Sequence, residues 1–257
     1  MENNRQQFHE QKVPQLSEEL GNFSSTLSKE NLEKITDSFE SDIFFYRIVT
    51  IDKGKIPEKI HFKHEKTGRA GYEKAMSLGR DLDICLYETG VTKQPVRLEE
   101  GKTRFLQKYT FHNDVAFVDI NKLGEYFPKE AEKFNLVDVE NYHEPSIAFA
   151  SGLSVNPAFL EKYPGLTAVP IVHPSASGTK QSHDGICCQL PEVYYNKNMS
   201  VITSDGYVEL PLDIYAGKCS IGDFTFTGYV QKDTDGILKN GQQANIDGSH
   251  AEGDQVP

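Results

Sequence analysis

The chain has 257 residues, of which 37% are hydrophobic and 25% charged, and its formal net charge is −11. This length suits one large domain, and the hydrophobic fraction is sufficient for a core surrounded by polar segments. The negative charge excludes a protein that mainly binds nucleic acid or an anionic membrane surface, because both tasks need clustered Lys and Arg. No apolar stretch is long enough to span a bilayer.

The N-terminal segment is polar. Residues 1–27 are rich in Gln, Glu, Asn and Ser, so we predict a flexible leader without a classical signal peptide. Such a leader is compatible with delivery into a host cell by a specialised secretion system, and equally with an ordinary mobile terminus. The four cysteines include no C-x-x-C pair. Reduced thiols in the cytoplasm are therefore expected, rather than a disulfide framework or a zinc site.

The first half of the chain mixes helical and strand patterns. Ser28 is a candidate N-cap for a helix over 28–39, and the aromatic and β-branched run 42–51 predicts a buried strand. Further along, the patterns predict a helix over 70–78 that ends at Gly79, a strand over 82–87, and a strand pair formed by 104–111 and 115–120.

The second half is richer in strands. Pro128 and Pro157 are candidate first-turn residues of helices that reach Phe134 and Tyr163. The remaining patterns predict a strand over 166–173, a polar loop over 174–185, strands over 193–203 and 207–215 that flank a hairpin turn at 204–206, and a strand over 224–231. A single α+β domain over 28–231 is expected, followed by a disordered polar tail over 232–257.

One candidate for chemistry is the segment Phe45-Tyr46-Arg47 in the first predicted strand. An arginine inside an apolar strand is costly unless its head group finds a partner. A phosphate suits the guanidinium because the two can form paired hydrogen bonds. A carboxylate partner, or an extended side chain that reaches solvent, is the structural alternative.

Two further segments carry hydroxyl and carboxylate groups. Ser151 and Ser154 lie in a predicted small-residue turn, where they could position a sugar or simply cap a helix. Glu192 lies at the mouth of a predicted strand, where a carboxylate can stabilise a ribosyl cation or remain a solvated strand end. Tyr194 and Tyr195 alternate on that strand, so one ring could stack on a ligand while the other faces the core.

In chain order, these segments resemble the Arg–Ser–Glu class of mono-ADP-ribosyltransferases over residues 43–203. The resemblance implies an α+β fold in which an N-terminal helix precedes a split, largely antiparallel two-sheet core. It implies NAD as substrate without a metal, and transfer of ADP-ribose to a protein acceptor, as bacterial effectors and toxins do.

The resemblance also implies roles for particular residues. Arg47 would hold an NAD phosphate, with Tyr46 and Tyr194 as further NAD-binding candidates. Ser151 or Ser154 would support the nicotinamide ribose, and Glu192 would stabilise the cationic transition state. The family has Glu or Gln two residues before this glutamate, and this chain has Leu190 there. An unusual acceptor, hydrolysis of NAD or loss of activity would follow from that difference.

Other interpretations remain open. A non-catalytic α+β protein-interaction module, either an effector or the partner of one, explains the acidic charge equally well. Asp81 and Asp83 are spaced like the magnesium ligands of nucleotidyltransferases, and exposed carboxylates are the simpler reading. The motif His61-x-x-His64 is part of a metal-site pattern or of a solvated loop. Cys187 and Cys188, with a distant histidine, are candidate nucleophiles or inert buried thiols.

Overall fold

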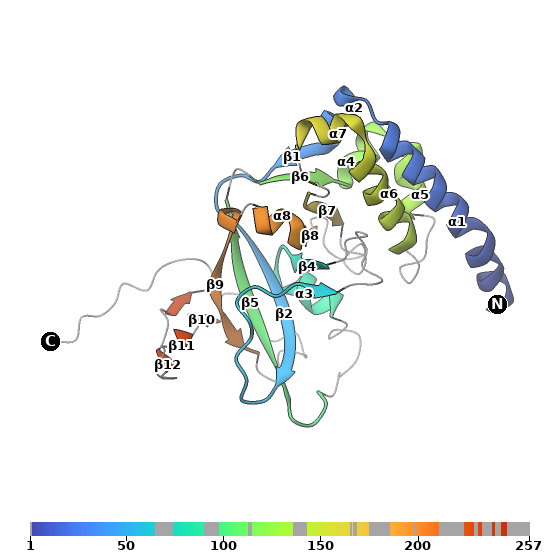
Figure 1. Cartoon of the computed structure of the whole chain (residues 1–257). Coiled ribbons are helices and arrows are strands. Elements are labelled where there is room, and N and C mark those ends of the chain that lie inside the picture. The colour runs from blue at the N-terminus through green and yellow to red at the C-terminus, as the bar shows by residue number, and fades with distance from the viewer. Residues whose placement is uncertain are drawn as a thin grey trace.

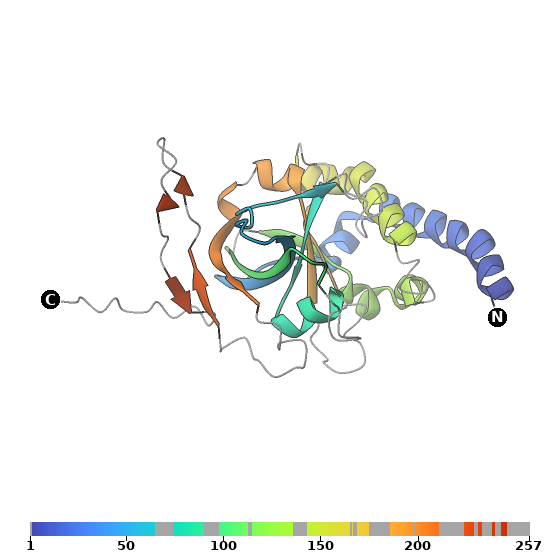
Figure 2. The ribbon, with the colours of Figure 1, turned by 90° about the horizontal axis from the view of Figure 1, so that it is seen from below.

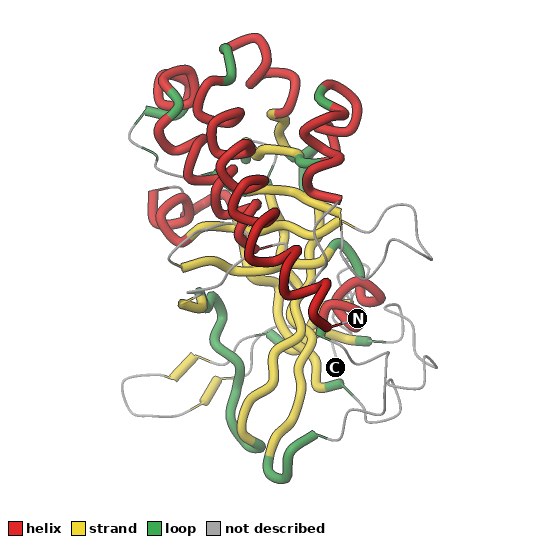
Figure 3. The backbone as a smooth tube through the Cα atoms, turned by 90° about the vertical axis from the view of Figure 1, so that its right-hand side faces the viewer, coloured by secondary structure: helices red, strands yellow, loops and turns green. Residues whose placement is uncertain are grey.

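An eleven-stranded sheet organises the computed structural model of the protein, with most of the helices gathered at one end of it (Figures 1 and 3). The structure describes residues 2–64, 74–89, 98–112, 115–135, 143–164, 166, 169–174, 186–197, 199–210, 224–228, 231–232, 238–239 and 243–245.

Three helices begin at residues that the sequence indicates. Ser28 caps α2 by accepting a hydrogen bond from the backbone N–H of Asn31 at 3.2 Å, and Pro128 and Pro157 begin α5 and α7. None of the described helices is both long and apolar enough to cross a membrane. The helices are α1 (Glu2–Thr26), α2 (Lys29–Ile35), α3 (Leu82–Glu88), α4 (Asn121–Tyr126), α5 (Pro128–Asn135), α6 (His143–Val155), α7 (Pro157–Lys162), α8 (Glu192–Lys197) and the 3₁₀ turn η2 (Met199–Val201).

The strands pair mainly in antiparallel fashion; β6 and β7 form a parallel pair. The sheet order is β1-β6-β7-β8-β4-β2-β5-β9-β10-β13, with β3 paired to β4, and β11 pairs with β12 separately. The strands are β1 (Thr36–Ser38), β2 (Ile43–Asp52), β3 (Lys63–His64), β4 (Lys74–Gly79), β5 (Lys102–Phe111), β6 (Ala116–Asp119), β7 (Ile171–Pro174), β8 (Ile186–Pro191), β9 (Ile202–Glu209), β10 (Thr225–Thr227), β11 (Gln231–Lys232), β12 (Leu238–Lys239) and β13 (Gln243–Asn245).

The sheet consists of two halves. One half runs from β1 to β4 and the other from β2 to β13, and Figure 2 shows these strands from below. Among the described residues, the halves are joined by one paired position, Tyr46 with Gly79. This arrangement confirms the predicted α+β class, in which an N-terminal helix precedes a split and largely antiparallel core.

Both faces of β2 and β5 are buried. Their pairing extends from Ile43 opposite Phe111 to Asp52 opposite Lys102, so alternate side chains point to opposite sides. Phe45 and Tyr109 lie in the main core, whereas the side chains on the other face join a second, smaller cluster. The near-continuous apolar run of β2 reflects this two-sided burial.

For two short segments in the first half of the chain, the predicted helix is a strand and the predicted strand is a helix. The predicted helix over 70–78 is strand β4 in its described part, and the predicted strand over 82–87 is helix α3. The strands predicted over 104–111 and 115–120 exist but do not pair with each other. Instead β5 lies between β2 and β9, because partners distant in the sequence complete its hydrogen bonds.

Other boundaries also differ. The helix predicted over 28–39 ends at Ile35, where β1 begins. The segment predicted as a strand over 193–203 is α8 and η2 up to Val201. The predicted hairpin turn is part of β9: Asp205 is the extra residue of a β-bulge, and Gly206 has φ +142°. An Asp-Gly pair serves a bulge as well as a turn, since both need positive φ.

The expected leader over 1–27 contains α1, and the end of this helix belongs to the folded domain. Leu20, Ser24 and Leu27 are buried. Asn156, which is fully buried, donates from Nδ2 to the carbonyls of Ser24 at 2.8 Å and Leu27 at 2.9 Å. The start of the domain therefore lies before residue 28. Pro174, predicted as the start of a loop, ends β7, and the rest of that loop, 175–185, lies outside the described residues with most of the tail over 232–257.

Candidate functional site

Arg47 lies in the middle of β2 with 6% of its surface exposed. Its Nη1 donates a hydrogen bond of 2.6 Å to the carbonyl oxygen of His61. Gln107, opposite Arg47 on β5 and fully buried, donates from Nε2 to the carbonyl of Glu58 at 2.7 Å. Two buried polar side chains thus fix the backbone of residues 57–64, termed the strap, across this face of β2 and β5.

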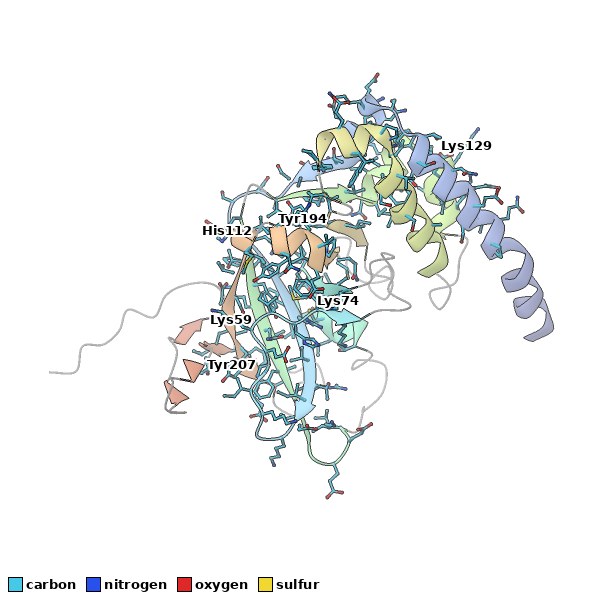
Figure 4. All side chains as sticks on the ribbon, in the orientation of Figure 1. Lys59, Lys74, His112, Lys129, Tyr194 and Tyr207 are labelled. Atoms are coloured by element: carbon cyan, nitrogen blue, oxygen red, sulfur yellow. The ribbon has the colours of Figure 1, made fainter. Side chains whose placement is uncertain are left out.

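The strap leads from Arg47 to Glu192. The ring of Phe62 in the strap packs on the ring of Tyr195 of α8, with centroids 5.3 Å apart. The strap ends in β3, where His64 pairs with Lys74 of β4. Lys74, which is labelled in Figure 4, lies on β4. Its Nζ is 3.2 Å from Oε2 of Glu192 at the start of α8. Arg47 is therefore bonded to the strap at His61, and the last residue of the strap, His64, pairs with the Lys74 that contacts Glu192.

Glu192 begins α8 directly after β8, whereas the sequence predicts that a strand begins at the next residue. Its side chain is 32% exposed. A carboxylate in the first turn of a helix interacts favourably with the positive end of the helix dipole, and the Lys74 ammonium adds a second favourable charge. The exposed part of the carboxylate is available to a cationic group.

Tyr46 does not share this site, because adjacent residues of a strand point to opposite faces. Its ring stacks on that of Phe226 with centroids 6.5 Å apart. Burial raises the pKa of the Tyr46 phenol to about 12. The Tyr46 side chain therefore lies on the face of β2 opposite to Arg47, and its role in binding NAD stays a prediction.

Tyr194 lies in a segment that the sequence predicts to be a strand. It lies on α8 rather than on a strand, and it is 4% exposed within the main core. Tyr195 carries the ring that faces the strap. The helical period of α8 places Glu192 and Tyr195 on one side, whereas the assumed strand period separated them.

Ser151 and Ser154 lie in helix α6, not in a turn. Ser154 Oγ donates to the carbonyl of Ser151 at 2.7 Å, and Ser151 is exposed. The helix packs against α1 and α7. The small residues of this segment serve that packing: a Cβ on Gly152 would collide with Ser24 Oγ and the Gly21 carbonyl of α1. The serines thus belong to the helical end of the molecule and not to the strap.

The face of the sheet that holds Tyr46 carries a polar cluster that the sequence analysis did not identify. Lys108 of β5 is 2% exposed, and its Nζ lies 3.9 Å from the ring centroid of Phe44. The Nζ is also 3.9 Å from Oδ2 of Asp205, which accepts a 2.5 Å hydrogen bond from Thr110. The bulge in β9 presents Asp205 to this lysine. The sequence feature that could have revealed this cluster is a charged residue inside an apolar strand pattern, the same feature that pointed to Arg47.

The residues proposed above as metal ligands or nucleophilic thiols have structural roles or surroundings that explain them, where the structure describes them. Asp81 Oδ1 accepts a hydrogen bond from the backbone N–H of Ile84 at 2.9 Å and so caps α3, while Asp83 is exposed. His61 Nδ1 lies 2.5 Å from Oε2 of Glu58. Within the described part of the chain, no three His, Cys, Asp or Glu side chains are placed to hold a metal ion. Burial raises the pKa of the Cys188 thiol, which disfavours the thiolate needed in a nucleophile.

Comparisons with known proteins find one similar solved structure, at low sequence identity. No protein-family model matches the sequence. No curated protein matches it either. Among solved structures, the chain is similar to one described as the crystal structure of the M. tuberculosis MbcT–MbcA toxin–antitoxin complex, with 11% sequence identity and a TM-score of 0.44. That similarity covers 72% of this chain and 94% of the other.

Proposed function

We propose that the chain is an NAD-dependent mono-ADP-ribosyltransferase that modifies a protein, as bacterial effectors and toxins do. The observation that carries this proposal is the strap, which bonds the buried Arg47 guanidinium through His61 and pairs through His64 with the strand that carries Lys74, the partner of Glu192. A dinucleotide needs such a pair of separated charged sites, one for its phosphates and one for the ribose that reacts.

The two sites have different chemical tasks. The Arg47 guanidinium binds a phosphate in exchange for its contact with the His61 carbonyl, because a planar fork of N–H donors matches phosphate oxygens. The Glu192 carboxylate stabilises the positive charge that develops on the ribose as its bond to nicotinamide breaks. The electron pair of that bond leaves with the nicotinamide nitrogen. Tyr46, Tyr194, Ser151 and Ser154 have no role in this assignment.

The first test compares two glutamates in similar ion pairs. Glu192 contacts Lys74 at 3.2 Å, and Glu161 on α7 contacts Lys29 at 3.2 Å. We expect Glu192→Gln to abolish the release of nicotinamide from NAD while NAD still raises the melting temperature. Glu161→Gln should retain full activity. Equal activity of the two variants would refute the assignment of Glu192.

A second candidate function is a non-catalytic protein-interaction module. It is favoured by the hydrogen bond between Arg47 and the strap, which gives the buried guanidinium a structural role without any ligand. NAD at about 100 times its Kd should stabilise the enzyme by roughly 2.7 kcal/mol. If NAD at millimolar concentration leaves the melting temperature unchanged, the interaction module becomes the better assignment.

A further inference from the structure

Two buried cysteines, Cys85 and Cys187, are both neighbours of Gly79. Cys187 of β8 is the register partner of Gly79 in β4. Partner residues of antiparallel strands face the same side, with Cβ positions about 4.5–5.5 Å apart. A Cβ on Gly79 would lie 2.8 Å from Sγ of Cys85, which is on α3. Because Gly79 has no side chain, it places no atom beyond its backbone between Cys85 and Cys187.

The placement of α3 explains why Cys85 lies there. Asp81 caps the helix immediately after β4, so α3 folds back over the end of that strand. Ile84 and Cys85 then cover Gly79, and a Cβ at this position would also lie 3.0 Å from Ile84. Cys85 and Cys187 are 4% and 5% exposed, and neither is part of a disulfide. A disulfide needs Cβ atoms about 3.5–4.5 Å apart, so closing one between Cys85 and Cys187 requires α3 and β8 to reach that spacing beside Gly79.

We propose that Cys85 and Cys187 are a redox-sensitive pair that closes into a disulfide when the protein meets a peroxide. One thiolate attacks a peroxide oxygen, the O–O bond breaks, and a sulfenic acid and one water form. The second thiolate attacks the sulfenic sulfur, the S–S bond forms, and a second water leaves. Two thiols are oxidised by two electrons, and one hydrogen peroxide is reduced to two waters.

Cys188 is a built-in control. It neighbours Cys187 on β8 but points to the opposite face, into the main core, where it is fully buried. The disulfide would attach α3 to the strand that continues into α8 and Glu192. The pairing itself depends on Gly79 and not on the proposed function, so it can be tested without NAD.

The test uses the full chain treated with excess hydrogen peroxide. The protein is then unfolded, alkylated and digested without reductant, and the peptides are sequenced by tandem mass spectrometry. We expect one cross-linked pair that joins Cys85 to Cys187, with two hydrogens lost and with Cys188 carrying the alkyl group. Reductant should restore both separate peptides. Cys85→Ser and Cys187→Ser should each abolish the cross-link, whereas Cys188→Ala should retain it.

Three results would overturn the proposal. They are alkylation of both Cys85 and Cys187 after oxidation, oxidation of either to a sulfinic acid without a cross-link, and pairing of either with Cys188 or Cys219. The wild-type peptide map decides among these results even if a cysteine variant fails to fold. Gly79→Ala provides a second test, because its methyl group would occupy the position beside Cys85 Sγ and should reduce the yield of the cross-link at least several-fold.

Discussion

Tyr46 and Arg47 are neighbours on β2, yet they serve opposite faces of the sheet. The Tyr46 ring stacks on Phe226 in the smaller core cluster, whereas Arg47 donates to the His61 carbonyl of the strap. A ligand held between the strap and the sheet would meet Arg47 and not Tyr46. The two residues therefore form a natural pair of variants for testing the proposed site.

We predict that Arg47→Gln weakens NAD binding by about 10-fold or more, while Tyr46→Phe leaves the Kd within about twofold of the wild type. The glutamine can still donate to the strap carbonyl but lacks the charge, and hydrogen bonds to charged groups contribute about 1.5–3 kcal/mol. Isothermal titration calorimetry measures both constants. A similar loss in both variants would show that the two residues act through the stability of β2 rather than through contact with NAD.

The sequence predicted correctly that both residues lie on a strand. It could not show which face of the sheet each side chain occupies, or which of them could contact a ligand. The run Ile43–Asp52 is apolar on both sides, so its pattern shows burial without showing which face meets which partner. Glu192 was selected as a candidate because of its charge, and the segment directly after it, predicted as a strand, is part of helix α8. The strap was not anticipated, since its contacts join Arg47 to His61 and Gln107 to Glu58 through backbone carbonyls that no sequence pattern reports.

The close contact between α1 and α6 gives a second prediction. A methyl group on Gly152 would collide with Ser24 Oγ and with the Gly21 carbonyl, so the helices would have to separate. We expect Gly152→Ala to destabilise the fold by about 1–3 kcal/mol, as overpacking does. Gly124→Ala is the matched control, because no atom lies within 4 Å of a Cβ on Gly124. Urea unfolding measures the difference, and equal stability of the two variants would mean that α1 is not held against α6 in solution.

A third prediction separates capping from metal binding at Asp81. Because Asp81 Oδ1 accepts the Ile84 N–H, Asp81→Ala should cost about 1 kcal/mol of unfolding free energy, and Asp81→Asn, which can still cap, should cost much less. Asp83→Ala, which changes an exposed side chain, should have a small effect. Thermal unfolding with and without magnesium is the measurement. A rise in melting temperature with magnesium that Asp81→Asn removes would restore the metal-site interpretation.

The same region shows why two short elements were exchanged in the prediction. Lys74–Gly79 contains Ala, Met and Leu, which favour helices, but its pairing with β8 over five residues makes it a strand. Leu82–Glu88 has β-branched and aromatic residues but folds as a helix after its Asp81 cap. Short apolar runs do not separate the two periods, so tertiary partners decide. Where a proline or a capping serine marks an end, as at Pro128 and Ser28, the prediction holds.

The last prediction concerns alkaline pH. Burial raises the pKa of the Tyr163 phenol to about 12, and the side chain is 9% exposed. The phenol of an unfolded tyrosine ionises near pH 10. The contribution of this phenol to the free energy of unfolding is therefore fully present below pH 10, and it is lost as the pH rises from about 10 to 12. At pH 11 the loss should be about 1 kcal/mol. We therefore expect Tyr163→Phe to lose less stability than the wild type between pH 9 and pH 11, as measured by urea unfolding. Parallel losses in the two proteins would show that the Tyr163 phenol is solvated in the folded state.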